Sequence, residues 1–194
     1  MLKRTLTLAA LLMSSFSVHA LFPGPYIGLL AGESYTNYNA SNVGLSSADV
    51  TNNGFGGGLF VGYQFDNYWG MDLSYIQYNN TRFKNMNGAS GVTGTVDENS
   101  LQLMFKGSYP FSDKGFRANG KLGVAYLTST TSSEFPSNNT QAPDQSRFVP
   151  AYALGISYDI TTSVPLELFW NQTFGGGNMQ NANIVGLSLS YYFF

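Results

Sequence analysis

The chain has 194 residues, which is enough for one domain, and its formal charge of −2 offers no basic surface for a nucleic-acid backbone. Charged residues make up only 10% of it, whereas 22 Gly, 15 Phe and 13 Tyr are present, an unusual composition for a soluble enzyme. Because Cys is absent, disulfides, thiolate metal sites and Cys nucleophiles are excluded. His19 is the single histidine. We expect no cofactor, no metal site, no nucleic-acid partner and no enzymatic activity.

The first 20 residues have the pattern of an export signal. Lys3 and Arg4 precede an apolar run at 6–13, and the small residues at 18–20 suit a signal peptidase. Cleavage there would leave residues 21–194, remove His19 and change the formal charge from −2 to −4, because two positive charges are lost. The apolar run is too short to span a bilayer as a helix, and no long apolar window follows it. A mature chain in a membrane would therefore cross it with strands.

After residue 20, apolar side chains recur at every second position, which is the period of a β-strand. The connections alternate between tight turns at 65–68, 112–115 and 160–163 and long Asn- and Ser-rich loops at 37–53, 79–97, 128–147 and 174–182. This pattern is typical of an all-β, eight-stranded antiparallel up-and-down transmembrane β-barrel. The predicted strands are 25–36, 54–65, 68–78, 98–110, 115–127, 148–160, 163–173 and 183–194.

The alternation also predicts which face of the wall is apolar. Leu101, Leu103 and Phe105 alternate with Gln102 and Lys106, and several other predicted strands show the same pattern. A charge at mid-strand is costly in hydrocarbon, so we expect the polar row to point inward and the apolar row to face lipid. An eight-stranded barrel is just wide enough to be filled by side chains.

Aromatic residues near the strand ends predict two belts at the membrane–water interfaces. The expected short-turn belt is Phe65, Tyr68, Trp69, Phe111, Tyr158 and Phe193, and the expected long-loop belt is Tyr35, Phe55, Tyr78, Phe148 and Trp170.

Several segments carry a resemblance to a known family. The segment 101–111 (LQLMFKGSYPF), followed by a short acidic turn and KLG at 121–123, resembles strands 4 and 5 of the OmpA-like transmembrane domain family. Further similar segments follow that family's strand order over essentially the whole mature chain, and the periplasmic peptidoglycan-binding domain of full-length OmpA proteins has no counterpart. These segments are 25–28, 71–75, 150–161 and 185–194.

The resemblance implies a polar, plugged interior in which charges pair across strands. Asp72, Lys106 and Lys121 match the family's interior charges on strands 3, 4 and 5, whereas Ser157 and Glu167 stand where the family has an acid and an arginine. The pairing pattern should therefore differ from that of the family. Mutual neutralisation that holds the packing is favoured over an ion gate, because a lone buried charge is costly. The predicted interior charge network is Asp72, Lys106, Arg117, Lys121 and Glu167.

The terminal aromatic residues resemble the family's C-terminal signal for the outer-membrane assembly machinery. The apolar row of the last strand includes Tyr191 and Phe193 and leaves Phe194 one residue beyond it. Either Phe193 takes the signal position, or a local bulge brings Phe194 into line.

We predict an integral protein of a Gram-negative outer membrane, with long loops outside and with short turns and both termini in the periplasm. Its expected role is structural and surface-exposed, including adhesive or host contacts, and its expected partners are outer-membrane lipids, lipopolysaccharide and the assembly machinery. Two alternatives remain open, a narrow ion-conducting pore and a secreted lipocalin-like binder with its apolar face turned inward. The predicted contact regions are loops 37–53, 79–97 and 128–147, with Phe83, Met86 and Phe135 as apolar points.

Overall fold

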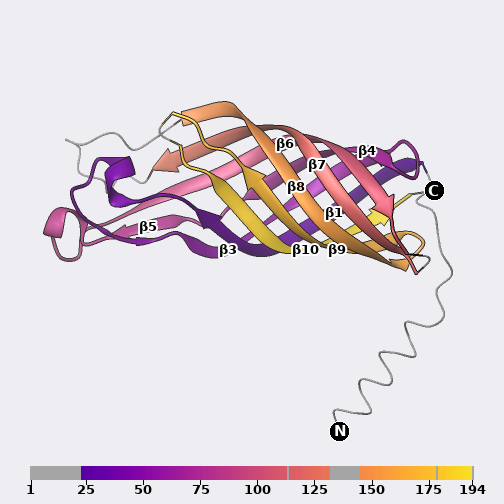
Figure 1. Ribbon diagram of the computed structural model, residues 1–194. Coiled ribbons are helices and arrows are strands. Elements are labelled where there is room, and N and C mark those ends of the chain that lie inside the picture. The colour runs from indigo at the N-terminus through magenta and orange to yellow at the C-terminus, as the bar shows by residue number, and fades with distance from the viewer. Residues whose placement is uncertain (1–22, 113, 132–144, 178, 194) are drawn as a thin grey trace, which may run out of the picture.

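A computed structural model describes residues 23–112, 114–131, 145–177 and 179–193, and within them eight long antiparallel strands close into a barrel (Figure 1). The predicted fold is confirmed. Each long strand pairs with the next long strand along the chain. The long strands are β1 (Gly24–Thr36), β3 (Asn53–Gln64), β4 (Trp69–Gln77), β6 (Thr93–Pro110), β7 (Phe116–Thr131), β8 (Gln145–Thr161), β9 (Val164–Thr173) and β10 (Ala182–Tyr192).

The barrel closes between its first and last strands. β1 and β10 pair without interruption from Tyr26↔Tyr192 to Thr36↔Ala182. Closure gives the backbone N–H and C=O groups of both strands partners on either side, which a strand in hydrocarbon requires because no water can replace a missing hydrogen bond. The described residues contain no helix that is long and apolar enough to cross a membrane.

The wall has its apolar face outward, as predicted. Leu103, Leu122 and Leu168 are 47%, 69% and 56% exposed, whereas Lys106 and Glu167 are only 5% and 9% exposed. A lipocalin-like binder would need the opposite orientation, with the apolar row around an internal ligand. That alternative is wrong for this chain.

On seven of the eight long strands the outward apolar row changes to a polar residue toward the long-loop end, whereas on β3 the outward residue paired with Glu33 is Phe55. Above Leu101 of β6, for example, the next outward position is Asn99, and above Tyr126 of β7 it is Thr128. We take this change as the upper limit of the membrane-facing band. The first polar outward residues beyond it are Glu33, Gln77, Asn99, Thr128, Ser146, Gln172 and Asn183.

Most predicted belt residues lie on the outer surface of the wall. Phe55 and Phe148 are 77% and 74% exposed at the long-loop end, and Trp69 is 49% exposed at the other end. The assignment of Tyr78 to the belt is wrong, because this side chain is 1% exposed and points into the barrel. Tyr78 follows β4 on the inward row, where its hydroxyl finds hydrogen-bonding partners that lipid could not offer.

Two of the predicted long loops, 37–53 and 79–97, contain regular secondary structure. They contain the short strands β2 (Asp49–Thr51) and β5 (Thr81–Lys84) and the single-turn 3-10 helices η1 (Ala40–Val43) and η2 (Met86–Gly88). β5 pairs with β2 on one side and with the upper part of β6 on the other. We call residues 37–52 and 79–97 the cap; Figure 1 shows β5 and its neighbours projecting beyond the barrel.

Three strands extend beyond their predicted lengths at the long-loop end of the barrel. β6 starts at Thr93 rather than 98, β7 continues to Thr131 and β8 starts at Gln145, so the predicted loop 128–147 is partly strand. Residues 132–144 lie outside the described part. Above the apolar band both faces of these strands carry many hydroxyl and amide side chains, so the alternation that marks a strand in sequence is weak there.

Candidate functional site

A polar network fills the membrane-facing interior of the barrel. Asp72 of β4 forms an ion pair with Lys121 of β7, with 2.6 Å between Oδ2 and Nζ, and also accepts a hydrogen bond from the Tyr26 hydroxyl. Because β4 and β7 are separated by β6, this pair joins strands that are not neighbours. It satisfies two charges that would be very costly to bury alone.

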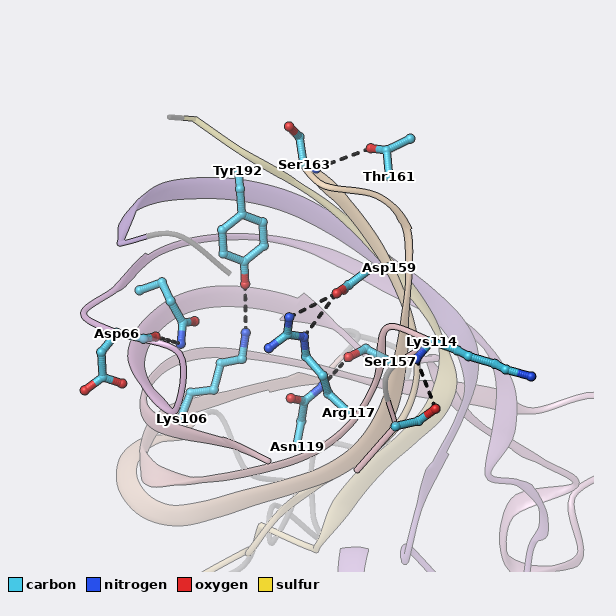
Figure 2. A network of polar contacts seen from close by, with 12 residues as sticks. Asp66, Lys106, Lys114, Arg117, Asn119, Ser157, Asp159, Thr161, Ser163 and Tyr192 are labelled. Atoms are coloured by element: carbon cyan, nitrogen blue, oxygen red, sulfur yellow. Dashed lines mark hydrogen bonds and ion pairs between the residues drawn. The ribbon is translucent and has the colours of Figure 1, made fainter. Parts of the chain in front are cut away.

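Lys106 of β6 has aromatic partners. Its Nζ donates to the Tyr192 hydroxyl at 2.9 Å (Figure 2) and lies 5.0 Å and 5.6 Å from the ring centroids of Tyr26 and Tyr192. The two rings are stacked, with centroids 4.5 Å apart. Cation–π attraction is strongest for a desolvated cation, so these rings compensate part of the cost of burying the ammonium group.

A second ion pair lies near the short-turn end. Arg117 of β7 donates from Nε and Nη2 to Oδ2 of Asp159 on β8, at 3.2 Å and 3.1 Å (Figure 2). Both side chains are buried. The pair links neighbouring strands near the turn between β8 and β9 with charge-assisted hydrogen bonds.

Glu167 of β9 is held by neutral donors. Its Oε1 accepts from Asn119 Nδ2 at 3.1 Å, and its Oε2 accepts from the Ser188 hydroxyl at 3.4 Å. Asn119 also donates to Ser157, which stands where the resembling family has an acid. Asn119 therefore links Ser157 and Glu167.

A layer of neutral hydrogen bonds crosses the barrel above these charges. Gln102 of β6 and Asn171 of β9 exchange hydrogen bonds across the lumen, with 2.9 Å from Asn171 Nδ2 to Gln102 Oε1. The Tyr78 hydroxyl joins the same layer through Thr173, at 2.8 Å, and Ser100, at 3.1 Å. The layer therefore ties opposite walls together and obstructs the lumen.

Little space is left between these layers. The interior cavity beside Asp72, Gln102 and Glu167 measures about 30 Å³, room for about two water molecules. No group of three or more His, Asp or Glu side chains able to hold a metal ion occurs among the described residues. The arrangement is suited to holding the barrel rigid.

All five residues of the predicted network point inward, and two of them, Asp72 and Lys121, form an ion pair. Asp72 binds Lys121, whereas Lys106, Arg117 and Glu167 have partners outside the predicted set. Asp159 is absent from that set, although it continues the inward row of β8 and could have been found by extending the alternation by one step. The alternation also places Tyr26 and Tyr192 on the inward rows, but no sequence pattern marks them as partners of Lys106.

The predicted apolar contact points of the loops are wrong where the structure describes them. Phe83 and Met86 are 0% and 1% exposed, because they fill a second hydrophobic core inside the cap. Phe135 lies outside the described residues. The cap core consists of Tyr38, Val43, Leu45, Phe83, Met86 and Val96.

The residues predicted as an assembly signal lie at the end of β10 and directly after it. Tyr191 and Phe193 are both half exposed on the outer wall, and Tyr192 between them points inward. The pairing of β10 with β1 is regular up to Tyr192, and the Phe193 N–H donates to the Pro25 carbonyl at 3.0 Å. Among the described residues Phe193 therefore takes the outermost lipid-facing position, while Phe194 lies outside them.

Similar proteins agree with this architecture. The chain is 27% identical to outer membrane protein A of Salmonella typhi over 163 residues, covering 83% of this chain and 43% of that protein, so it spans less than half the length of this relative. Neisserial surface protein A has a similar structure, with a TM-score of 0.61, 16% identity and coverage of 88% of this chain and 97% of that one. The attachment invasion locus protein of Yersinia pestis also has a similar structure, with a TM-score of 0.52 and 17% identity. The match covers 88% of this chain and 99% of that one.

At these identities the solved structures show the likeness of fold alone. The sequence match is wider, because residues 6–193 match the family described as the outer membrane protein beta-barrel domain. With the apolar outer wall and the filled polar interior, this match places the protein in the outer membrane. The chain belongs to the outer membrane protein beta-barrel domain family.

Proposed function

We propose that this protein is a non-catalytic scaffold of the outer membrane that presents its cap at the cell surface for contact with molecules outside the cell. The observation that carries the proposal is the contrast between a filled barrel and a separately folded cap. A filled lumen favours a structural role, and a loop region with its own core offers a defined surface for recognition.

The proposed orientation places the cap outside and the short turns in the periplasm. Outer-membrane barrels have short periplasmic turns and longer extracellular loops. The test uses single cysteines in this cysteine-free chain, at exposed Ser90 in the cap and exposed Lys114 in a short turn. On intact cells an impermeant maleimide should label Ser90→Cys and leave Lys114→Cys unlabelled until the cells are lysed; the reverse pattern would overturn the orientation.

The surface of the cap supports a contact role. Arg82 and Lys84 of β5 are exposed opposite Thr51 and the exposed Asp49 of β2, so the surface combines charges of both signs with hydrogen-bonding groups. The similar barrel from Yersinia pestis is an attachment invasion locus protein, crystallised with the heparin analogue sucrose octasulfate. That ligand belongs to the other protein; here the fold supports only the general role of surface contact.

Binding can be tested with cells that produce the wild-type protein or the variant Phe83→Asp. The variant places a charge in the cap core and leaves the membrane-facing wall unchanged, so it should lose the cap surface and keep the barrel. Wild-type cells should adhere to some members of a panel of immobilised glycans and matrix proteins, and variant cells should not. Equal adhesion of wild-type, variant and empty cells would contradict a contact role for the cap.

Planar-bilayer recording distinguishes the proposed scaffold role from the alternative role as an ion pore. Because the interior cavity holds about two water molecules, we expect no stable conductance. A stable conductance that changes in Asp72→Asn or Lys106→Met would establish the pore instead.

Two further partners belong to this proposal. Lipids and lipopolysaccharide would cover the outward apolar band, and the assembly machinery would recognise the end of β10 at Tyr191, Phe193 and Phe194. Phe193→Ala should lower the amount of heat-modifiable barrel in the outer membrane. Unchanged assembly of both Phe193→Ala and Phe194→Ala would exclude these two aromatic residues as the signal.

A further inference from the structure

The side chain of Tyr38 crosses the mouth of the barrel. Tyr38 follows β1, and its hydroxyl donates to Glu98 of β6 at 2.8 Å and lies 3.3 Å from the Ser129 hydroxyl of β7. In the closed barrel β7 is the strand opposite β1, with three strands between them in either direction. Tyr38 therefore joins one wall to the far wall at the long-loop end.

Tyr38 is also part of the cap. Its ring packs in the cap core with Val43, Phe83 and Val96, and its carbonyl accepts a hydrogen bond from Asn52 Nδ2 at 2.7 Å. A movement of Tyr38 away from Glu98 would therefore disturb the cap core, and loosening of the cap would pull Tyr38 from the mouth. One hydrogen bond thus couples the cap to the barrel.

Glu98 lies beyond the apolar band, one residue above outward-facing Asn99. Its side chain is 0% exposed, and its Oε2 is buried and has no hydrogen-bond partner. It forms no ion pair with any described residue. A buried carboxylate with a single donor is costly when ionised and much less costly when protonated.

Burial favours the neutral form of Glu98, and no base is recorded in contact with its carboxyl group among the described residues. Tyr38 above it and Tyr78 after β4 are the titratable side chains that face it, and Asp97 is its neighbour on β6. Arg147 of β8, two strands from Glu98, has its side chain against Gly176 and Gly177, and Arg82 of β5 is exposed on the outer face. Burial raises the pKa of Tyr38 well above its usual value, and Glu98 raises it further, so Tyr38 keeps its proton.

We propose that Tyr38 and Glu98 form a proton-controlled latch that holds the cap over the barrel mouth while Glu98 is protonated and loosens when Glu98 ionises. Burial raises the pKa of Glu98 from 4.5 to about 7, although the Tyr38 hydrogen bond opposes the shift. A pKa raised in the closed state means that protonation favours closure. The added stability of the cap is therefore complete below about pH 4.5 and is lost as the pH rises through about 7.

Cap opening can be measured in the full-length protein in lipid nanodiscs through the reactivity of single cysteines. Val43→Cys places a thiol on η1 in the buried cap core, and Ser47→Cys places one on the exposed cap surface as the matched control. The ratio of their maleimide-labelling rates removes the dependence of thiol chemistry on pH. A pKa of 4.5 in the open state and about 7 in the closed state predicts that this ratio rises by up to about seventyfold between pH 5 and pH 8.

A second set of variants assigns the effect. Glu98→Gln, which cannot ionise, should keep the ratio low at both pH values, and Tyr38→Phe, which lacks the hydroxyl, should raise it at both. The exposed acid Glu33 provides a control, because Glu33→Gln should keep the wild-type pH profile. A flat wild-type ratio, or a pH-dependent ratio in Glu98→Gln, would overturn the latch; heat-dependent gel mobility checks that each variant retains its barrel.

Discussion

The cap and the membrane-facing wall share strand β6, but they place their apolar side chains on opposite faces of it. In the upper part of β6, Val96 points inward into the cap core while Thr95 and Asp97 point outward. Seven residues farther along the strand, about 23 Å at ~3.3 Å per residue, Leu103 points outward, and Lys106 beyond it points inward. The strand is continuous, but its apolar side chains change from the inner face in the cap to the outer face in the wall.

The change reflects the surroundings of the strand. Water surrounds the cap, so burying apolar groups inside stabilises it as in any soluble fold. Lipid surrounds the wall and solvates apolar groups as well as the interior would, so polar side chains gain by gathering inside the barrel, where they hydrogen-bond to one another. The point of reversal between Asp97 and Leu101 therefore marks the membrane boundary on β6.

The largest expected effect is the loss of cap stability when a side chain of the cap core is removed. Phe83→Ala should destabilise the cap by about 3–5 kcal/mol, because it leaves a cavity in a core of only a few side chains. Hydrogen exchange detected by mass spectrometry should show faster exchange in residues 79–97 with unchanged exchange in β9 and β10. Phe55→Ala, which removes an exposed ring from β3, is the control; equal effects of the two changes would contradict the existence of a separate cap core.

The charged interior gives the next prediction. Asp72→Ala should destabilise the barrel by about 3–5 kcal/mol, since it leaves Lys121 without its carboxylate partner. Adding Lys121→Met should recover much of the loss, because the unpaired charge is then removed as well. Denaturant unfolding in detergent micelles measures both variants, and a double variant less stable than Asp72→Ala alone would show that the ion pair is not the source of the effect.

The outward faces of the two regions can be compared on β7 alone. Leu122→Arg should cost about 2–4 kcal/mol, because it places a charge on the lipid-facing wall. Thr130→Arg introduces the same side chain on the same face beyond the apolar band, where we expect almost no change. Unfolding in vesicles distinguishes them; similar losses at both positions would place the membrane boundary elsewhere.

The smallest effect concerns the start of η1. The Asn39 side chain accepts a hydrogen bond from the Asn42 N–H at 3.0 Å, and Asn42 Oδ1 accepts from the Asn39 N–H. Asn39→Ala should cost the cap about 1 kcal/mol and leave barrel unfolding unchanged. Exchange of the amide at Gly44 would report the loss, and a change in barrel unfolding would show tighter coupling between cap and barrel than we propose.

The fold and most of the wall were predictable because each depends on short-range patterns. Leu103 and Lys106 differ by an odd number of positions, so they must lie on opposite faces of one strand whatever the rest of the chain does. The cap was not predictable in this way. Phe83 and Met86 are isolated apolar residues among polar ones, and only their meeting with Tyr38 and Val43 from another loop makes a core.

The sequence by itself therefore determined the strand period, the sidedness of the wall and the inward position of every predicted charge, because side-chain direction alternates with residue number and a lone charge is costly in lipid. Only the tertiary structure decided the partners. Arg117 meets Asp159, Tyr38 reaches Glu98 and Asp72 reaches Lys121 because barrel closure and strand register set these distances. Such contacts join residues 42, 60 and 49 positions apart, a separation over which no local pattern carries information.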